Sequence, residues 1–330
     1  MRTELPYQCV DEEQLKGLLG FKPVEKLGQN FLVDPGMIQK FVTSTINGAD
    51  VVEIGCGPGN LTVGIARRAA EVVGIEIFPG FSEAQKVLLR DCPNVKILNQ
   101  NALVFDYEGW INSDVEARHQ VIGNIPFHIS EPLLTMLAGI SSWLEDITLL
   151  VGGRLAETMA VLDPRSDRYT RMSFVASVFD IGRKTHVPRK CFWPVPRTDS
   201  DIVSLTYSEY PKNGRLLPFL VRRSIVASAT GNLSLSKVLD SLSIDSEDGK
   251  VRGKEGTHRF NRRQTRNELR QMAISYNTRV IDERKTRDNG SVRTSRLSER
   301  IQLPRQILSK PFGRLDNQEV RQLAVAIDNL

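Results

Sequence analysis

An amide, a proline and an aromatic ring follow one another in "NIPF", where Asn124, Pro126 and Phe127 come directly after a short apolar run. The amide oxygen of asparagine accepts hydrogen bonds from an amino group, and an aromatic ring stacks on a planar heterocycle. Together these side chains could hold the exocyclic amine of a base in line with a reactive group. Gly-Asn followed by Pro also fits an ordinary turn, so the stretch alone leaves both interpretations open.

A glycine-rich stretch, "VVEIGCGPGN", places Glu53, Gly55, Gly57 and Gly59 at alternate positions where an apolar run ends. Glycines suit a sharp turn between strand and helix, because the absence of a Cβ lets a ligand approach the backbone. A dinucleotide fingerprint would need glycine at position 60, which is Asn60. The spacing instead matches E-x-G-x-G-x-G, the S-adenosylmethionine loop of Rossmann-like methyltransferases.

An acidic residue at the end of the next apolar run completes this pattern. Glu76 follows Gly55 by 21 residues, and its carboxylate could accept two hydrogen bonds from ribose hydroxyls. Ile77 comes next and is counted with the cofactor site. The glycine-rich loop, the acidic Glu76 and the pattern of apolar runs together predict a nucleotide-like cofactor.

The elements that must position these residues are short, mostly β-branched runs separated by stretches long enough for helices. This spacing predicts βαβ units and a parallel sheet that is buried on both faces. After residue 210, apolar positions recur at helical spacing in 217–229 and 318–330. We therefore predict a Rossmann-like α/β domain over 1–210 and a smaller helical domain over 211–330, with an insert near 231–259. The predicted strands cover 51–55, 72–77, 95–98, 119–123, 146–151, 172–180 and 201–207.

Charge is distributed unevenly along the chain. Residues 211–330 hold 24 Lys and Arg against 13 Asp and Glu, whereas residues 1–210 hold 20 against 26. Such a basic region favours a polyanionic partner, because Lys and Arg that neutralise phosphates release counterions. A solvated charged face is the alternative interpretation.

Other functional classes find little support in the sequence. The four cysteines contain no Cys-x-x-Cys pair and the four histidines no ligand-spaced pair, so we expect no metal site and a reducing compartment. No run of 18 apolar residues occurs, and the first 20 residues lack the apolar stretch of a secretory signal, so we expect no membrane association. Acidic residues near the N-terminus also differ from an organelle presequence.

The motifs together resemble the KsgA-type rRNA adenine N6-dimethyltransferases, including their mitochondrial relatives, the transcription factor B group. The resemblance covers about residues 14–230, with a weaker match in the last 70. Its most specific part is "KLGQNFLVDPGMIQKFV", and "NIPFHISEPLL" is similar to the family's "NLPYxISxPLL". "SDRYTRMSF" and "FWPVPRTDSDIV" resemble its later segments "YGRLS" and "FxPxPKVDSxVV".

This resemblance implies an S-adenosyl-L-methionine cofactor and a base pocket. Asn124 and a neighbouring backbone carbonyl would accept the amino hydrogens of adenine, Phe127 would stack on the base, and Phe192 would form a second wall. Pro126 of the same loop is counted with these catalytic residues. The alternative for Phe192 is a core aromatic. The implied cofactor site comprises Gln29, Asn30, Leu32, Gly55, Gly57, Gly59, Glu76, Ile77, Asn101, Ala102 and Asn124.

The chain departs from the family in three places. Gln100-Asn101-Ala102 stands where the family has Gly-Asp-Ala, so an amide replaces the carboxylate expected to receive the adenine amine of the cofactor. Phe127 replaces the commoner tyrosine. The family's basic helix is displaced, and we expect Arg262, Arg263 and Arg266 to contact RNA in its place.

The implied function is dimethylation of adenine N6 in small-subunit rRNA during ribosome assembly, by a protein that is a monomer outside the assembling subunit. A ribosome-assembly or mitochondrial transcription factor that keeps the fold without methylating is one alternative, motivated by Asn101. A DNA adenine methyltransferase is another, and the "GQNFL" leader argues against it. The leader favours a mitochondrial location, with the cytoplasm as the alternative.

Overall fold

The computed structural model describes residues 10–24, 27–208, 216–229, 232–240 and 297–330. These residues form two compact units. The first comprises residues up to Leu134 together with Leu144–Ala160 and Phe179–Tyr207. The second comprises Thr135–Trp143, Val161–Val178 and the described residues from Ser208 onward. The chain leaves the first unit for the last time after Tyr207, close to the boundary expected at residue 210. Two earlier segments, Thr135–Trp143 and Val161–Val178, also belong to the second unit.

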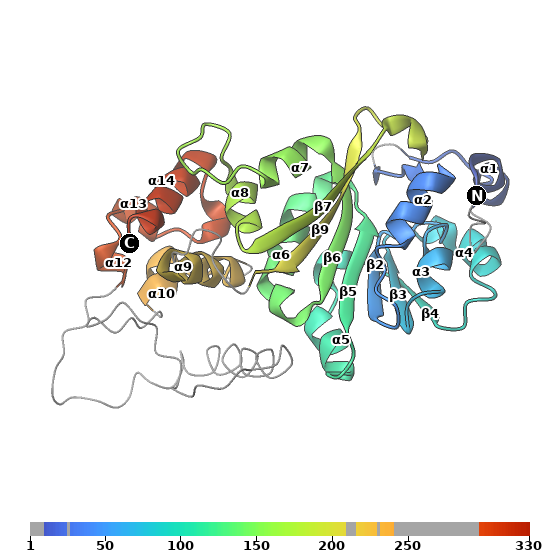
Figure 1. The fold of residues 1–330 in the computed structure, drawn as a ribbon, viewed down its shortest axis with the longest axis horizontal. Coiled ribbons are helices and arrows are strands. Elements are labelled where there is room, and N and C mark those ends of the chain that lie inside the picture. Colours follow the sequence, from blue (N-terminus) through green and yellow to red (C-terminus); the bar gives the residue numbers. More distant parts are fainter. Residues whose placement is uncertain (1–9, 25–26, 209–215, 230–231, 241–296) are drawn as a thin grey trace. The chain divides into compact units, whose positions relative to one another are not determined.

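Seven strands form the sheet of the first unit, in the order β4-β3-β2-β5-β6-β9-β7 (Figure 1). Strands β2 to β6 run parallel, and β9 lies antiparallel between β6 and β7. The predicted Rossmann-like α/β sheet is thus confirmed. Its strands are β2 (Asp50–Ile54), β3 (Glu71–Glu76), β4 (Val95–Asn99), β5 (His119–Asn124), β6 (Asp146–Gly152), β7 (Phe179–Val187) and β9 (Ser200–Tyr207). Outside this sheet, β1 (Phe31–Leu32) pairs antiparallel with β8 (Phe192–Trp193).

Helices connect the parallel strands, as expected for βαβ units. Helix α2 precedes β2, the first strand of the sheet, and begins where Asp34 accepts the backbone N–H of Met37 at 2.9 Å and Pro35 occupies the first turn. The α-helices of the first unit are α1 (Glu12–Leu19), α2 (Pro35–Val42), α3 (Thr62–Ala66), α4 (Ser82–Leu88), α5 (Tyr107–Ser113) and α7 (Gly153–Met159), and α6 (Ser130–Ile140) contains a boundary between the units. The 3-10 turns of the first unit are η2 (Pro79–Phe81), η3 (Ala102–Val104), η4 (Phe127–Ile129) and η6 (Arg189–Cys191), whereas η5 (Ser141–Trp143) belongs to the second unit.

Two apolar clusters hold the first unit together. One packs Ile38 and Phe41 of α2 and Ile65 of α3 with Val51 of β2, all of them buried. The other joins α1 to the region around η2 and α4 through buried Leu15 and a group of aromatic rings. Neighbouring ring centroids in that group lie 5.0 to 6.2 Å apart, within the range of favourable edge and offset contacts. The rings are those of Phe21, Phe31, Phe78, Phe81 and Trp193.

The strand predicted over 172–180 is wrong. Residues Arg171–Ala176 form helix α8, and strand β7 begins only at Phe179. Thr170 starts the helix with a capping box, because its side chain accepts a backbone N–H while Ser173 accepts the N–H of Thr170. Nearly every side chain of α8 is buried, so its β-branched and aromatic residues show no helical periodicity in the sequence.

The second unit is helical, and the helices predicted over 217–229 and 318–330 are confirmed. Its helices are α8, α9 (Leu216–Ala227), α10 (Leu235–Asp240), α12 (Leu297–Arg300), α13 (Arg305–Leu308) and α14 (Asn317–Asp328), with the 3-10 turn η8 (Phe312–Arg314). Helix α10 lies within the range of the predicted insert. Arg222 of α9 and Asp328 of α14 form an ion pair whose side chains are 13% and 15% exposed. Removing one partner of such a pair leaves a charge that the interior cannot solvate.

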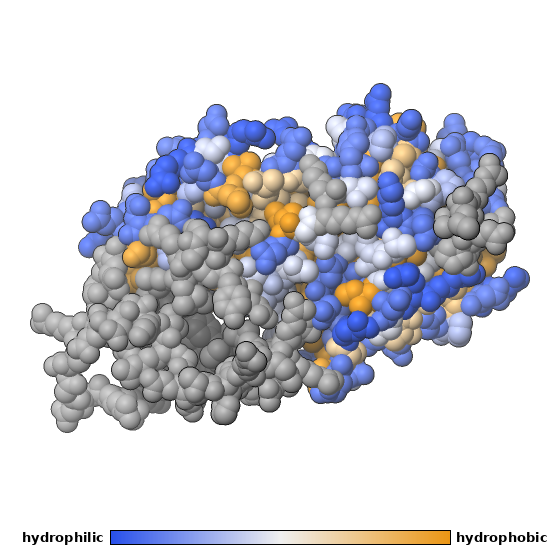
Figure 2. Space-filling view, viewed as in Figure 1, coloured by the Kyte–Doolittle hydropathy of each residue, from blue (hydrophilic) through white to orange (hydrophobic). Residues whose placement is uncertain are grey.

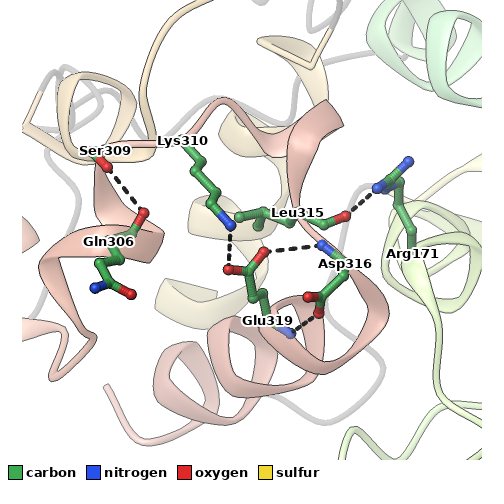
Figure 3. A network of polar contacts seen from close by, with 7 residues as sticks. All are labelled: Arg171, Gln306, Ser309, Lys310, Leu315, Asp316 and Glu319. Carbon is green, nitrogen blue, oxygen red and sulfur yellow. Dashed lines mark hydrogen bonds and ion pairs between the residues drawn. The ribbon is translucent and has the colours of Figure 1, made fainter.

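A polar network starts α14 and ties it to two other segments of the second unit (Figure 3). Asp316 accepts the N–H of Glu319 at 2.8 Å, and Glu319 accepts the N–H of Asp316 at 3.0 Å. Lys310 pairs with Glu319, and Arg171 donates to the carbonyl of Leu315. The ion pair with Lys310 lowers the pKa of Glu319, which favours the charged form in this capping box.

Hydrophilic side chains cover most of the described surface in Figure 2, and hydrophobic ones gather in small groups. Within the described residues, no helix combines the length and the apolar character needed to cross a bilayer. Exposed large apolar side chains include Ile77 and Val104, which follow β3 and β4.

Candidate active site

The predicted site residues meet at the carboxyl ends of three neighbouring parallel strands. Gly55 follows β2, Glu76 ends β3 and Asn124 ends β5. The strand order reverses between β2 and β5, since β3 and β4 lie on one side of β2 while β5 and β6 lie on the other. Ligands of open α/β sheets bind in the crevice at such a switch point.

The glycine turn has the backbone that its sequence predicts. Gly55, Gly57 and Gly59 have φ values of 69°, 53° and 97°, which side chains with a Cβ rarely adopt. A Cβ on Gly55 would lie 3.4 Å from the carbonyl oxygen of Asn124, and one on Gly57 would lie 3.1 Å from the ring of Phe31. The backbone conformation therefore favours glycine at all three positions, and at Gly57 a Cβ would also crowd the ring of Phe31.

Glu76 braces this turn with both carboxylate oxygens. Oε2 accepts the N–H of Gly57 at 3.0 Å and Oε1 accepts the N–H of Phe78 at 2.8 Å, while Gln85 donates to the carbonyl of Gly57 at 2.7 Å. Burial raises the pKa of Glu76, and these backbone hydrogen bonds oppose the shift. Each carboxylate oxygen retains a lone pair, so Glu76 can still accept a ribose hydroxyl. Ile77 beside it is 63% exposed, which leaves an apolar surface at the strand end.

Hydrogen bonds join the "GQNFL" segment to the residues after the glycine turn and to the segment after β8. Asn30 donates from Nδ2 to the carbonyl of Pro194 at 2.8 Å, and buried Gln29 accepts the N–H of Val24 at 2.7 Å. The side chain of Leu32 is fully buried in the core, and its carbonyl accepts Nδ2 of Asn60 at 3.0 Å. Leu32 can therefore line a cofactor site with its backbone only.

Asn124 is held by its amide nitrogen. Nδ2 donates to the carbonyl of Asn30 at 2.8 Å, and Oδ1 makes no hydrogen bond within the described part of the chain. The "NIPF" loop also packs directly on "GQNFL", because a Cβ on Gly28 would lie only 2.7 Å from Cβ of Pro126. Since the donor end is occupied, the free end of Asn124 is a hydrogen-bond acceptor.

The aromatic residues predicted for the base pocket have different positions. Phe127 begins η4, and its side chain lies outside the described part of the structure. Phe192 is 2% exposed and belongs to the core cluster of α2 and α3. Its ring packs against apolar neighbours in this conformation, which supports the core-aromatic alternative over a stacking wall. Trp193, the next residue, lies in the aromatic group beside Phe31 at 6.2 Å.

Asn101 and Ala102 follow β4 and form the start of η3. Oδ1 of Asn101 accepts the N–H of Leu103 at 2.9 Å and thereby caps this turn. Ala102 is buried. Oδ1 of Asn101, which was expected to accept a hydrogen bond from the adenine amine of the cofactor, therefore already accepts one from the backbone. An amide oxygen can accept a second hydrogen bond.

The structure gives no position for the arginines that were predicted to contact RNA. Arg262, Arg263 and Arg266 lie outside the described residues. Among those described, no group of three or more His, Cys, Asp or Glu side chains could hold a metal ion.

A cavity of about 800 Å³ lies in the second unit and contains none of the predicted site residues. Its lining includes Arg165, Arg321 and several carboxamide side chains.

Sequence reasoning missed two features of the site. The contact between Gly28 and Pro126 joins two motifs that are almost 100 residues apart, and no sequence signal indicates it. The complete burial of Glu53 was not predicted either, although the sequence singles this residue out as the first position of E-x-G-x-G-x-G.

The sheet order and the position of the site at the switch point are those of a Rossmann-like α/β fold. A model of the family described as "Ribosomal RNA adenine dimethylase" matches residues 20–245, more than half of the chain, and the chain belongs to this family. The predicted family is thus confirmed. The additional likeness to the transcription factor B group stays a prediction.

Several known proteins are similar to this chain over part or most of its length. The "Probable ribosomal RNA small subunit methyltransferase A" of Methanopyrus kandleri is 31% identical over 195 residues, which are 58% of this chain and 66% of that protein. The "Ribosomal RNA small subunit methyltransferase A" of Clostridium perfringens is 29% identical over 249 residues, 70% of this chain and 84% of that protein. A solved dimethyladenosine transferase from Plasmodium falciparum is similar with a TM-score of 0.49 and 20% identity, covering 89% of this chain and 96% of that one.

Proposed function

We propose that this protein transfers methyl groups from S-adenosyl-L-methionine to N6 of adenine in small-subunit rRNA, twice for each adenine, during assembly of the small ribosomal subunit. The observation that carries the proposal is the orientation of Asn124. Its amide nitrogen is bound to the carbonyl of Asn30, so Oδ1 is the group it offers at the end of β5. Membership of the ribosomal RNA adenine dimethylase family supports the substrate.

The residues at the switch point fit the proposed cofactor. Gly55 and Gly57 have positive φ values and leave the backbone of the turn without Cβ atoms, and Glu76 presents a carboxylate at the end of β3 where a ribose would lie. Exposed Ile77 offers an apolar surface for an adenine ring. When bound, S-adenosylmethionine supplies an electrophilic methyl group on a sulfonium.

Asn124 would raise the nucleophilicity of the substrate amine. The lone pair of adenine N6 is delocalised into the ring, which makes the amine a poor nucleophile. Hydrogen bonds from the amino hydrogens to Oδ1 of Asn124 and to a backbone carbonyl of the loop favour a more pyramidal nitrogen whose lone pair is available. Stacking on Phe127 would hold the extruded base in line, which is the role predicted for that residue.

A strong general base is not required for this reaction. Once the methyl group has transferred, the nitrogen carries a positive charge and its proton becomes acidic enough to leave to water. The loop Asn124–Ile129 contains one titratable side chain, exposed His128. This composition agrees with a mechanism based on position and hydrogen bonding.

A second candidate is a ribosome-assembly or mitochondrial transcription factor that keeps the fold without methylating. The observation that favours it is Asn101, whose oxygen already caps η3 and carries no charge for a cofactor amine. The first proposal includes three further points. The protein would be mitochondrial, it would contact rRNA through Arg262, Arg263 and Arg266, and it would be a monomer outside the ribosomal subunit.

Labelled S-adenosylmethionine separates these candidates. Equilibrium binding of the label tests for a cofactor, and transfer of label to naked rRNA and to immature small subunits tests for catalysis. Asn124→Ala should bind cofactor within a few fold of the wild type and lose most transfer. Wild-type protein that binds the label but transfers none to either substrate would support the assembly factor.

A further inference from the structure

Large apolar side chains are exposed on the segments that surround the "NIPF" loop. Val24 and Leu27 are each 42% exposed, and Val195 is 60% exposed. All three belong to the first unit. Single exposed apolar residues are normal on a protein surface, whereas a group of them beside a reactive site marks a place where another molecule binds.

Backbone pairing brings these three residues together. Strands β1 and β8 pair antiparallel, and the hydrogen bond from Asn30 to the carbonyl of Pro194 continues this pairing beyond the strands. Val195 follows Pro194 directly, and Leu27 lies three residues before Asn30, so the two residues occupy neighbouring stretches of chain. The carbonyl of Val24 accepts the N–H of Leu27 at 3.0 Å. We refer to Val24, Leu27 and Val195 as the apolar lip.

The apolar lip adjoins the loop that would hold the target adenine. Gly28, where the first segment of the lip ends, packs against Pro126, and Asn124 donates to the carbonyl of Asn30. Both contacts attach the lip to the carboxyl end of β5. Ile77, the exposed apolar residue on the cofactor side, follows β3 and lies across β2 from this strand. The lip therefore borders the substrate side of the site.

Charges beside the lip indicate the kind of molecule that it binds. Arg189, Lys190 and Arg197 are exposed on the segments before and after β8. The acid of the same segments, Asp199, already accepts the N–H of Arg189 at 2.8 Å and lies 3.4 Å from His186. An apolar surface edged by cations suits an RNA strand, because the bases gain from apolar contact and the phosphates from positive charge.

Extrusion of a base creates a need that the lip can meet. A base that turns out of its stack leaves the face of its neighbour exposed to water, which costs free energy. Proteins that separate neighbouring bases often place aliphatic side chains against the uncovered face. Aliphatic side chains that are exposed beside the acceptor loop are in the position that this task requires.

We propose that the apolar lip contacts the nucleotide next to the target adenine and replaces the stacking that this nucleotide loses when the adenine enters the site. The proposal rests on the proposed function, because it assumes that RNA binds at the "NIPF" loop. Leu27 and Val195 are thereby positioning residues, which act on the RNA strand and not on the methyl group.

Photo-crosslinking in immature small subunits tests which molecule the lip contacts. A p-benzoylphenylalanine residue in place of Leu27 or Val195 should crosslink to rRNA at a nucleotide adjacent to the adenine that wild-type protein methylates. The matched control carries the same group in place of Val115, which is 47% exposed before the amino end of β5 and should give no such crosslink. Crosslinks of the lip to a ribosomal protein or to distant rRNA, or none above the control, would overturn the inference and leave the proposed function intact.

Kinetics with polar and apolar variants provide a second test. Leu27→Ser combined with Val195→Ser should lower kcat/KM for immature subunits roughly 10-fold, because these side chains no longer gain from leaving water, and should leave the affinity for S-adenosylmethionine unchanged. Leu27→Met combined with Val195→Ile keeps the apolar surface and should retain wild-type rates, as should Val115→Ser. Normal kcat/KM in the double serine variant, or weaker cofactor binding by it, would overturn the inference. Wild-type protein that methylates no rRNA would overturn the proposed function and the inference with it.

Discussion

Gly28 is the residue whose substitution most directly tests how the two sequence motifs position the site. Its φ is +71°, and a Cβ at this position would lie 2.7 Å from Cβ and 3.2 Å from Cα of Pro126. Gly28→Ala must therefore adopt a conformation that alanine disfavours and push the "NIPF" loop away from "GQNFL". Because Asn30 follows two residues later, the hydrogen bond that orients Asn124 should be displaced as well.

The expected cost has two parts. A left-handed conformation costs an L-residue about 1 to 2 kcal/mol, and forcing a methyl group into a packed contact typically costs about 1 to 3 kcal/mol. Gly28→Ala should thus lower the free energy of unfolding by about 2 to 5 kcal/mol. Gly20→Ala is the matched control, since Gly20 has a φ of +62° but no atom lies within 4 Å of the position that its Cβ would take. It carries the conformational cost alone.

The assay combines denaturant unfolding with methyl-transfer kinetics. A displacement of about 1 Å in a positioning group can cost on the order of 100-fold in rate, so Gly28→Ala should lower kcat by roughly 10- to 100-fold. Gly20→Ala should retain normal turnover. Equal loss of stability in the two variants together with normal turnover of Gly28→Ala would refute the idea that this contact orients Asn124.

Four further predictions concern the cofactor site and the second unit. Asn101→Asp keeps the cap on Leu103 and adds a charge, so calorimetry should detect tighter S-adenosylmethionine binding by about 1 kcal/mol; unchanged affinity would mean that Asn101 does not face the adenine. Asp328→Ala leaves the largely buried Arg222 without its partner and should lower the free energy of unfolding by about 2 to 3 kcal/mol in denaturant titrations. A loss below about 1 kcal/mol would mean that the pair behaves like one at the surface. Burial raises the pKa of Glu53 in the folded protein from 4.5 to about 8, so the stability that protonated Glu53 contributes is full below pH 4.5 and is lost as the pH rises to 8. The stability of Glu53→Gln relative to the wild type should therefore increase over this pH range. A constant difference in the free energy of unfolding at all pH values would contradict this prediction. Replacing Arg262, Arg263 and Arg266 by Ala should flatten the salt dependence of RNA binding by up to three phosphate contacts, and an unchanged slope would indicate a solvated face.

The sequence predicts those parts of the fold that depend on local pattern. The runs that became β2, β5 and β6 are buried along almost their whole length, as predicted for central strands, and the positive φ values of Gly55, Gly57 and Gly59 follow from their spacing. Helix α8 was missed because a helix buried on all sides has no amphipathic period. The position of β9 between β6 and β7 depends on long-range pairing, which no local pattern indicates.

The sequence also predicts which strand ends carry the site residues. Gly55, Glu76 and Asn124 end adjacent strands as their motifs indicate, because parallel strands bring their carboxyl ends to one edge. Partners within the site were not predictable. The side chain of Leu32 faces the core, Phe192 packs there as well, and one carboxyl oxygen of Glu53 is left without a partner, since each of these outcomes depends on how separate segments pack.

Mass spectrometry of adenosines from small-subunit rRNA tests the central claim most directly. Immature small subunits that lack the modification are incubated with the protein and S-adenosylmethionine, and the rRNA is digested to nucleosides. The account predicts N6,N6-dimethyladenosine with wild-type protein and its near absence with Asn124→Ala, although both proteins bind the cofactor. Unmodified adenosine after incubation with cofactor-bound wild-type protein, or equal dimethylation by Asn124→Ala, would contradict it.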